Sequence, residues 1–390
     1  MTPLRIAILA GEESGDQLGA DLVRALQAMT GRPVELIGVG GPHLQALGLK
    51  PLFDPGEIAI MGISAVLRDL PRLLRRIGQT ARLVTAAKPD CLITIDSPEF
   101  NLRVSKKVRA ADPSIPIVKY VCPSVWAWRP GRAPAMAPYI DHVLCLLPFE
   151  PEALERLGGP PGTYVGHRMT HDAGLIAAAE AQLARQPGTE EKTLVLLPGS
   201  RRSEVKTLLD DFGAVVKILH GRGHRLRLLL PTVARVAPMV EAETASWPVT
   251  PEISTDPAAK WKAFGEGDAA LAASGTVSLE LALARLPFVV TYKMDWIARR
   301  LLSLIKTWSV SLPNLIADRA IVPEFYNEAV RPPMMSRYVE ALFEPGPARD
   351  AQRQGFAMVA EAMATARPSG ELAAEVVLGE MEKRRVASSE

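Results

Sequence analysis

TLVLLPGSRRSEV, residues 193–205, places an apolar strand, a small-residue turn and a polar helix start in direct succession. IAILAGEESGD, residues 6–16, repeats this order near the start of the chain. A strand, a tight turn and a helix in this order open a doubly wound α/β unit. Because the pattern occurs twice, we predict two Rossmann-like domains, residues 1–185 and 186–349, with a C-terminal helix within 350–390 joined to the first domain.

Short apolar runs alternate with helix-length segments along the chain, which predicts parallel sheets covered by helices on both faces. Neither glycine-containing turn matches GxGxxG or GxxxxGK[ST], so dinucleotide and Walker-type phosphate loops are not expected. The stretch LARQPGTEEKT, residues 183–193, has the composition of a linker between the two domains. The candidate strands are residues 5–10, 34–39, 91–95, 116–121, 142–147, 193–198, 226–231, 268–273 and 287–292.

Composition narrows the class of protein. The chain has 390 residues, is 48% hydrophobic and 23% charged, and carries a net charge of only +2, so no global field favours nucleic acid. No signal peptide and no run long enough to cross a bilayer is evident, and we expect a cytoplasmic protein. Its three cysteines lack paired spacing, so we expect reduced thiols and no metal site.

Residues 57–82 combine an apolar stripe with a basic remainder, although Pro71 interrupts the segment. An apolar face with a cationic rim is typical of a helix at a membrane surface, whereas a core-packed helix with a solvated arginine face has the same pattern. The candidate membrane contacts are Ile63, Val66, Leu67, Leu70, Leu73, Leu74, Arg72 and Arg76.

Two turns at the ends of predicted strands have the features of an anion site. In residues 272–290 the turn is Ser274-Gly275-Thr276, and the helix that follows would point its amide groups at a pyrophosphate. Glu280 lies about one turn further along, where it is able to accept hydrogen bonds from ribose hydroxyls. A serine or threonine before a helix is also an ordinary cap, so the pattern alone leaves both interpretations open.

The second such turn is Gly199-Ser200-Arg201. Glycine allows a close backbone approach, serine caps a helix, and the planar arginine fork suits a phosphate. An exposed loop arginine is the alternative. Ligands bind at the carboxyl ends of strands in open α/β sheets, and this favours the phosphate role.

Three stretches of the first domain also follow predicted strands. ITIDSPEFNLR, residues 93–103, places Asp96 and Glu99 where a strand ends, so they are either helix-start acids or a general base. GEESGDQLGA, residues 11–20, offers Ser14 and Gly15 for a tight turn and as candidate substrate-binding residues. YVCPSVWAWRPGR, residues 120–132, contains Trp126, which stacks on a sugar ring or packs in the core.

Nine segments between residues 5 and 325 together resemble the sequences of lipid-A-disaccharide synthases, in their order and spacing. They are AGEESGD, IMGISAVL, IDSPEFN, YVCPSVWAWR, LPFE, VGH, LLPGSR, ASGTVSLE and SLPNL. The resemblance implies a GT-B fold, with the active site in a cleft between two Rossmann-like domains. It implies transfer of diacylglucosamine from UDP-2,3-diacylglucosamine to 2,3-diacylglucosamine 1-phosphate, with inversion, release of UDP and no cofactor. It also implies peripheral association with the cytoplasmic face of the inner membrane, and an oligomer is possible.

Residue roles follow from the same resemblance. The DxPDFN motif of the family falls on Asp96 to Asn101, with Glu99 in place of the second aspartate. We expect Glu99 as the base that deprotonates the attacking hydroxyl, Asp96 as an orienting group and Arg201 as a third catalytic residue. Asn101 is expected to bind substrate, and Asn314 to line the cleft. Rival interpretations are another UDP-sugar GT-B enzyme, such as a peptidoglycan glucosaminyl transferase or an epimerase, and a non-catalytic UDP-sugar-binding protein at the membrane surface.

Overall fold

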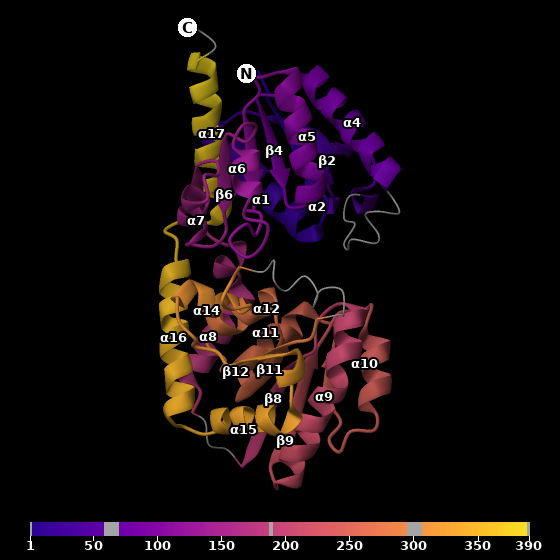
Figure 1. Ribbon diagram of the computed structural model, residues 1–390, viewed down its shortest axis with the longest axis vertical. Helices are drawn as coiled ribbons and strands as arrows, with labels where there is room; N and C mark the ends of the chain where they lie inside the picture. Colours follow the sequence, from indigo (N-terminus) through magenta and orange to yellow (C-terminus); the bar gives the residue numbers. More distant parts are fainter. Residues whose placement is uncertain (1, 58–69, 187–189, 295–305, 388–390) are drawn as a thin grey trace. The chain divides into compact units, whose positions relative to one another are not determined.

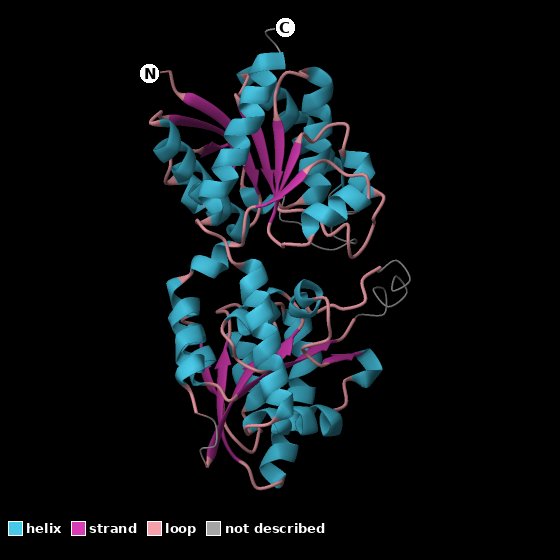
Figure 2. Ribbon diagram, turned by 90° about the vertical axis from the view of Figure 1, so that its left-hand side faces the viewer, coloured by secondary structure: helices cyan, strands magenta, loops and turns pink. Residues whose placement is uncertain are grey.

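The computed structural model describes residues 2–57, 70–186, 190–294 and 306–387. Two compact units make up the chain: residues 1–168 with residues 365–390, and residues 169–364. Each unit is a parallel β-sheet with helices on both faces, as Figure 2 shows. The predicted α/β class with two Rossmann-like units is therefore confirmed.

The first unit is built on a seven-stranded sheet in the order β3-β2-β1-β4-β5-β6-β7, and its strand pairs are parallel. The order reverses between β1 and β4, which is the position where open α/β sheets bind ligands. The strands are β1 (Leu4–Ala10), β2 (Val34–Val39), β3 (Lys50–Pro51), β4 (Cys91–Ile95), β5 (Ile117–Tyr120), β6 (His142–Cys145) and β7 (Gly162–Tyr164).

Alternation along β1 divides the core of this unit into two layers. Ile6 and Ile8 lie in the cluster that contains residues of α1 and α17, whereas Ala7 and Leu9 lie in the cluster that contains residues of α4 and α5. Figure 1 labels these four helices around the sheet. The helices of the unit are α1 (Glu13–Thr30), α2 (Pro42–Gln45), α4 (Leu70–Ala87), α5 (Pro98–Ala111), α6 (Arg132–Met136), α7 (Glu150–Arg156) and α17 (Ser369–Ala387).

The second unit has a six-stranded parallel sheet in the order β10-β9-β8-β11-β12-β13, with its reversal between β8 and β11. Its strands are β8 (Glu191–Leu197), β9 (Arg225–Pro231), β10 (Glu252–Ser254), β11 (Ala269–Ala273), β12 (Phe288–Tyr292) and β13 (Glu324–Tyr326). Its helices are α8 (Ala173–Ala184), α9 (Arg202–Gly221), α10 (Ala237–Thr244), α11 (Pro257–Glu266), α12 (Thr276–Leu283), α14 (Leu312–Ala317), α15 (Pro332–Phe343) and α16 (Pro347–Met363).

The boundary between the units lies between Arg168 and Met169, rather than between residues 185 and 186. Helix α8 belongs to the second unit because Gln182, which is buried, donates hydrogen bonds to the carbonyl groups of Phe264, Gly265 and Gly267. The expected C-terminal helix is two helices: α16 belongs to the second unit, and α17 packs on α1 in the first.

Of the helices in the described residues, none is long and apolar enough to cross a membrane.

Candidate functional site

A pocket of about 490 Å³ opens in the second unit at the reversal between β8 and β11. This volume is in the range of small-molecule sites. Both turns singled out in the sequence line it, together with residues that follow β9 and residues of α11. The lining includes Gly199, Ser200, Arg201, Glu204, Thr232, Asp256, Lys260, Ser274, Gly275 and Thr276.

The Glu204 carboxylate, on α9, holds the turn between β8 and α9. The backbone N–H groups of Ser200 and Arg201 donate to Oε2 of Glu204, at 3.3 and 3.2 Å. Arg201 Nη1 donates to Oε1 of the same carboxylate at 2.7 Å. Gly199 has φ +110°, and a Cβ there would lie 2.7 Å from Glu204 Oε2, so only glycine fits. The turn therefore brings the Arg201 guanidinium, paired with Glu204, to the pocket wall, while its backbone amides are occupied by Glu204.

The turn between β11 and α12 forms another part of the wall. Ser274 Oγ donates to the carbonyl of Val310 at 2.9 Å, which fixes the start of the turn. Gly275 has φ +155° with open space where a Cβ would lie, and Thr276 begins α12 with an exposed side chain. The amino end of a helix attracts anions through its N–H groups and its dipole. Both predicted anion-binding turns thus line one pocket.

Glu280 on α12 forms an ion pair with Lys260 on α11. Lys260 Nζ lies 3.0 Å from both carboxylate oxygens and 3.9 Å from the centre of the Trp261 ring. Lys260 also lines the pocket, so it brings positive charge near the place where a diphosphate would lie. Nothing in the sequence singles out Lys260, because one lysine on an amphipathic helix has no distinguishing pattern.

In the first unit, Gly15 and Asp96 meet at the reversal between β1 and β4. A Cβ at Gly15 would lie 3.2 Å from Ile95 Cγ2 and 3.3 Å from Asp96 Oδ2, so α1 approaches this carboxylate closely. Asp96 and Ser97 both have positive φ, 50° and 39°. Non-glycine residues in this region cost roughly 1–2 kcal/mol each, and such strain often marks functional sites.

The side chain of Asn101 holds this turn through hydrogen bonds to the backbone carbonyl groups of the turn. It is fully buried, and its Nδ2 donates to the carbonyl groups of Ile95 at 2.8 Å and Asp96 at 2.9 Å. Contact of Asn101 with a substrate stays a prediction. Ser14, by contrast, is exposed at the start of α1 beside Gly15.

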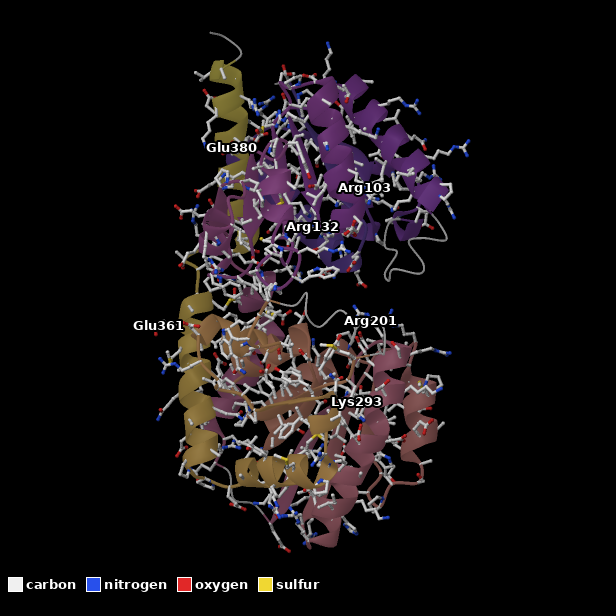
Figure 3. The ribbon with its side chains drawn as sticks, viewed as in Figure 1. Arg103, Arg132, Arg201, Lys293, Glu361 and Glu380 are labelled. Atoms are coloured by element: carbon white, nitrogen blue, oxygen red, sulfur yellow. The ribbon has the colours of Figure 1, made fainter. Side chains whose placement is uncertain are left out.

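The two acids of this stretch have different surroundings. Asp96 is mostly buried, and burial raises the pKa of its carboxyl, although the nearby ammonium of Lys119 opposes the shift. Glu99 is 42% exposed and lies among three arginines. Its carboxylate pairs with Arg129 at 3.0 Å, with Arg103 at 3.7 Å and with Arg132. Figure 3 labels Arg103, which lies on α5, and Arg132, at the start of α6. The charge of Glu99 is thus already compensated.

Trp126 is part of a buried polar network. Its Nε1 donates to Glu150 Oε1 at 3.2 Å, and its ring packs edge-on against Phe149. Glu150 Oε2 accepts from the backbone N–H groups of Leu146 and Leu147, and burial raises the pKa of Glu150 to about 7. These contacts favour the core interpretation of Trp126 over stacking on a sugar.

Two thiols approach the same carboxylate. Ligand atoms of Cys122, Cys145 and Glu150 lie within 4.8 Å of one another, and all three residues are buried. A side-chain hydrogen bond with Cys122 and burial raise the pKa of the Cys145 thiol. Three N–H donors already occupy the oxygens of Glu150, so these groups suit a structural network better than a metal.

Asn314 also has a structural role. It is buried, its Oδ1 accepts from the backbone N–H groups of Ile321 and Val322, and its Nδ2 donates to the carbonyl of Val322. All these bonds shape the loop that leads to β13, and Asn314 does not line the pocket at β8 and β11. The predicted role of Asn314 in lining the cleft stays a prediction.

The candidate membrane segment is described only in part. Ile63, Val66 and Leu67, and the side chain of Leu70, lie outside the described residues. Leu73 is 5% exposed and packs in the core with Ile77 of α4, so its side chain is not a membrane contact.

The outer face of α4 keeps the predicted character. Leu74 is 51% exposed, and Arg72 and Arg76 pair with Glu57 at 2.9 and 2.8 Å. Contact of this face with a membrane stays a prediction.

Comparisons with known proteins extend over nearly the whole chain. A family profile described as Lipid-A-disaccharide synthetase matches residues 6–361. The chain belongs to the lipid-A-disaccharide synthase family. One member, from Rhodopseudomonas palustris (strain HaA2), is 47% identical over 385 residues, 97% of each chain. Another, from Bradyrhizobium diazoefficiens, is 42% identical over 383 residues, 98% of this chain and 97% of the relative.

Solved structures with the same fold are much more distant in sequence. A MurG of Acinetobacter baumannii matches with a TM-score of 0.58 and 15% identity, over 98% of this chain and 100% of its own. A UDP-GlcNAc 2-epimerase of Neisseria meningitidis, solved with UDP-GlcNAc bound, matches with a TM-score of 0.57 and 10% identity, over 98% and 100%. These likenesses show the fold that this lipid-A-disaccharide synthase family member shares with GT-B enzymes.

Proposed function

We propose that the chain transfers diacylglucosamine from UDP-2,3-diacylglucosamine to the 6-hydroxyl of 2,3-diacylglucosamine 1-phosphate, with inversion at the anomeric carbon. The observation that carries this proposal is the family match over residues 6–361. The products are the β-1,6-linked disaccharide 1-phosphate and UDP. The pocket of the second unit and the acid-bearing turn of the first supply the groups that such a reaction needs.

The pocket at β8 and β11 is the proposed UDP site. We place the pyrophosphate beside the Arg201 guanidinium, which pairs with Glu204 in the structure, and beside the amide groups at the start of α12. Glu280 accepts hydrogen bonds from the ribose. As the anomeric C–O bond breaks, its electron pair passes to the diphosphate. Positive charge and amide dipoles stabilise that developing charge.

Asp96 is the proposed base, and this revises the sequence-based preference for Glu99. Asp96 is mostly buried at the ligand-binding edge of its sheet. Burial raises its pKa, which brings its proton affinity closer to neutral pH. Glu99 instead compensates Arg103, Arg129 and Arg132. In the proposed step, Asp96 takes the proton of the 6-hydroxyl as that oxygen bonds to the anomeric carbon. Glu99 keeps the three arginines ordered, and these suit the acceptor phosphate.

Peripheral binding to the cytoplasmic face of the inner membrane completes the proposal. Both substrates carry acyl chains, and the outer face of α4 presents Leu74 and Leu83 with Arg72, Arg75 and Arg82. Exposed leucines among arginines suit a surface of anionic lipid.

The test is release of UDP from UDP-2,3-diacylglucosamine in detergent, with and without the acceptor, by wild type, Asp96→Asn and Glu99→Gln. We expect acceptor-dependent turnover that falls about 10²- to 10⁴-fold in Asp96→Asn, as for loss of a general base. Glu99→Gln keeps more activity, with the loss mainly in KM for the acceptor.

Other outcomes would discriminate between the alternatives. Wild type that binds UDP but forms no disaccharide contradicts the enzyme proposal and favours a non-catalytic binding protein. Turnover of UDP-N-acetylglucosamine instead of the acylated donor favours another UDP-sugar enzyme. If Glu99→Gln is inactive and Asp96→Asn is active, the base is Glu99.

A further inference from the structure

Lys119 is a buried cation in the middle of the first unit's sheet. It lies on β5, where every residue is buried, and only 1% of its surface is exposed. Lysine is almost never fully buried unless its charge is paired, because removing an ammonium from water is costly. A buried lysine therefore needs a specific set of acceptors.

The acceptors of Lys119 are backbone carbonyl groups around the turn that carries Asp96. Lys119 Nζ donates to the carbonyl oxygens of Asp96 at 2.7 Å, Tyr120 at 3.1 Å and Thr94 at 3.4 Å. These three bonds use all the donors of an ammonium group. The shortest of them reaches the residue whose own φ is 50°.

We propose that Lys119 is a positioning residue for Asp96: its buried ammonium holds the left-handed turn at the end of β4 and presents the carboxylate of Asp96 to the substrate. This inference rests on the proposed role of Asp96 as the base. Asn101 Nδ2, at 2.9 Å, bonds the same carbonyl of Asp96. The lysine and the asparagine thus fix one strained peptide group together.

The charge of Lys119 acts on the carboxylate as well as on the turn. The ammonium lowers the pKa of Asp96, against the larger effect of burial, and so keeps part of the carboxylate ionised. Burial lowers the pKa of Lys119 to about 8, with Asp96 and Cys122 opposing the shift and Arg132 assisting it. Glu99 follows Asp96 by three residues, and its own charge is paired with arginines.

The direction of the pH effects follows. As pH rises through about 8, Lys119 loses its proton, the turn loses a charged donor, and activity falls. The unfolded chain keeps the lysine protonated up to its ordinary pKa, so the same change does not destabilise the fold. Loss of activity without loss of stability above pH 8 is what a positioning role predicts.

The experiment measures kcat/KM against pH for wild type, Lys119→Met and Lys119→Gln, with thermal unfolding of each. Lys192→Met is the matched control, because Lys192 is also a buried strand lysine but pairs with Glu344 in the second unit. In Lys119→Met and Lys119→Gln, we expect the acid limb of the profile of kcat/KM against pH to move up by about one pH unit. At a pH on that limb, kcat/KM then falls roughly tenfold. The alkaline limb near pH 8 disappears. Lys192→Met keeps both limbs.

A folded Lys119→Met or Lys119→Gln protein with the wild-type pH profile overturns the inference. A second measurement needs neither turnover nor a Lys119 variant: the ¹³C carboxyl signal of Asp96, assigned with Asp96→Asn, is followed through a pH titration. We expect a second inflection near pH 8 from Lys119, and its absence also overturns the inference. Wild type without acceptor-dependent turnover but with this inflection contradicts the proposed function alone.

Discussion

The ion pair of Lys260 and Glu280 determines the charge beside the pocket of the second unit. Both oxygens of Glu280 lie 3.0 Å from Lys260 Nζ, so the carboxylate does not present an uncompensated negative charge to a diphosphate. Each carboxylate oxygen has two lone pairs, which leaves capacity for ribose hydroxyls. The lysine therefore matters for the charged part of the ligand and the glutamate for the sugar.

Replacing Lys260 tests this division. We expect Lys260→Met to weaken UDP binding about tenfold, or roughly 1.4 kcal/mol, because Glu280 then repels the diphosphate. Titration calorimetry with UDP and with uridine measures the effect, which should be much smaller for uridine. Lys262→Met is the control, since Lys262 lies on the same helix, is 74% exposed and pairs with Glu266. Equal losses for UDP and uridine would contradict the charge argument.

The ionised carboxylate of Asp96 destabilises the folded state, so replacing Asp96 should stabilise the protein. Because burial raises its pKa, the folded state binds a proton more readily than the unfolded state, and the ionised carboxylate disfavours folding at neutral pH. We expect Asp96→Asn to unfold at the same or a higher temperature than wild type at pH 7, and this gain to shrink as pH falls. Calorimetry at pH 7 and pH 5 checks the sign. A lower unfolding temperature in Asp96→Asn at pH 7 would mean that the carboxylate stabilises the turn.

The conformation of the turn between β8 and α9 affects both the stability of the protein and the proposed UDP site. We expect Gly199→Ala to destabilise the protein by about 1–3 kcal/mol and to weaken UDP binding, because the methyl group would displace the Glu204 carboxylate from the N–H groups of Ser200 and Arg201. Gly221→Ala is the control: it lies in the last turn of the same helix, and open space surrounds its Cβ position. Urea unfolding and UDP titration compare the two. Wild-type UDP affinity in Gly199→Ala would exclude this turn from the site.

At the scale of elements, the sequence predicted the long strands well and the short ones not at all. The runs at residues 34–39 and 91–95 coincide with β2 and β4. Strand β4 is a continuous hydrophobic run, as is typical of a central parallel strand. The strands β3, β7, β10 and β13 at the sheet edges are two or three residues long, and no run of that length stands out from a loop. Neighbouring strands, rather than local sequence, define them.

The site was predictable to the extent that it lies in turns. Two turns follow strands directly, and the structure brings both to one pocket. Their residues are Gly199, Ser200 and Arg201 in one turn and Ser274, Gly275 and Thr276 in the other. Asn101 and Asn314 share motifs with such residues, yet their amides are consumed by backbone groups that only the folded chain brings near. Lys119 has one faint signal, a single cation inside the apolar run PIVKYV, residues 116–121.

At the scale of the whole molecule, the chain completes its first unit with its last helix. Linker-like composition at residues 183–193 suggested a later boundary, but the alanine-rich α8 before it packs on α11, and only its contacts assign it to the second unit. Similarly, α17 has no apolar stripe as regular as that of α4. Its buried residues Ala373, Ala374 and Val377 join the core beside Leu22 and Leu26 of α1.

This arrangement predicts that a destabilising substitution in α17 lowers the stability of the first unit. We expect Val377→Asp to lower the free energy of unfolding by about 3 kcal/mol or more, because it buries an unpaired carboxylate in a fully buried position. Val386→Asp, on the same helix but 48% exposed, is the control and should change stability little. Since every residue of the proposed UDP pocket lies in the second unit, UDP binding should persist in Val377→Asp while acceptor-dependent turnover falls. Calorimetric unfolding combined with UDP titration and the turnover assay measures all three quantities. Simultaneous loss of UDP binding at a temperature where Val386→Asp still binds would show that the two units fold as one cooperative body.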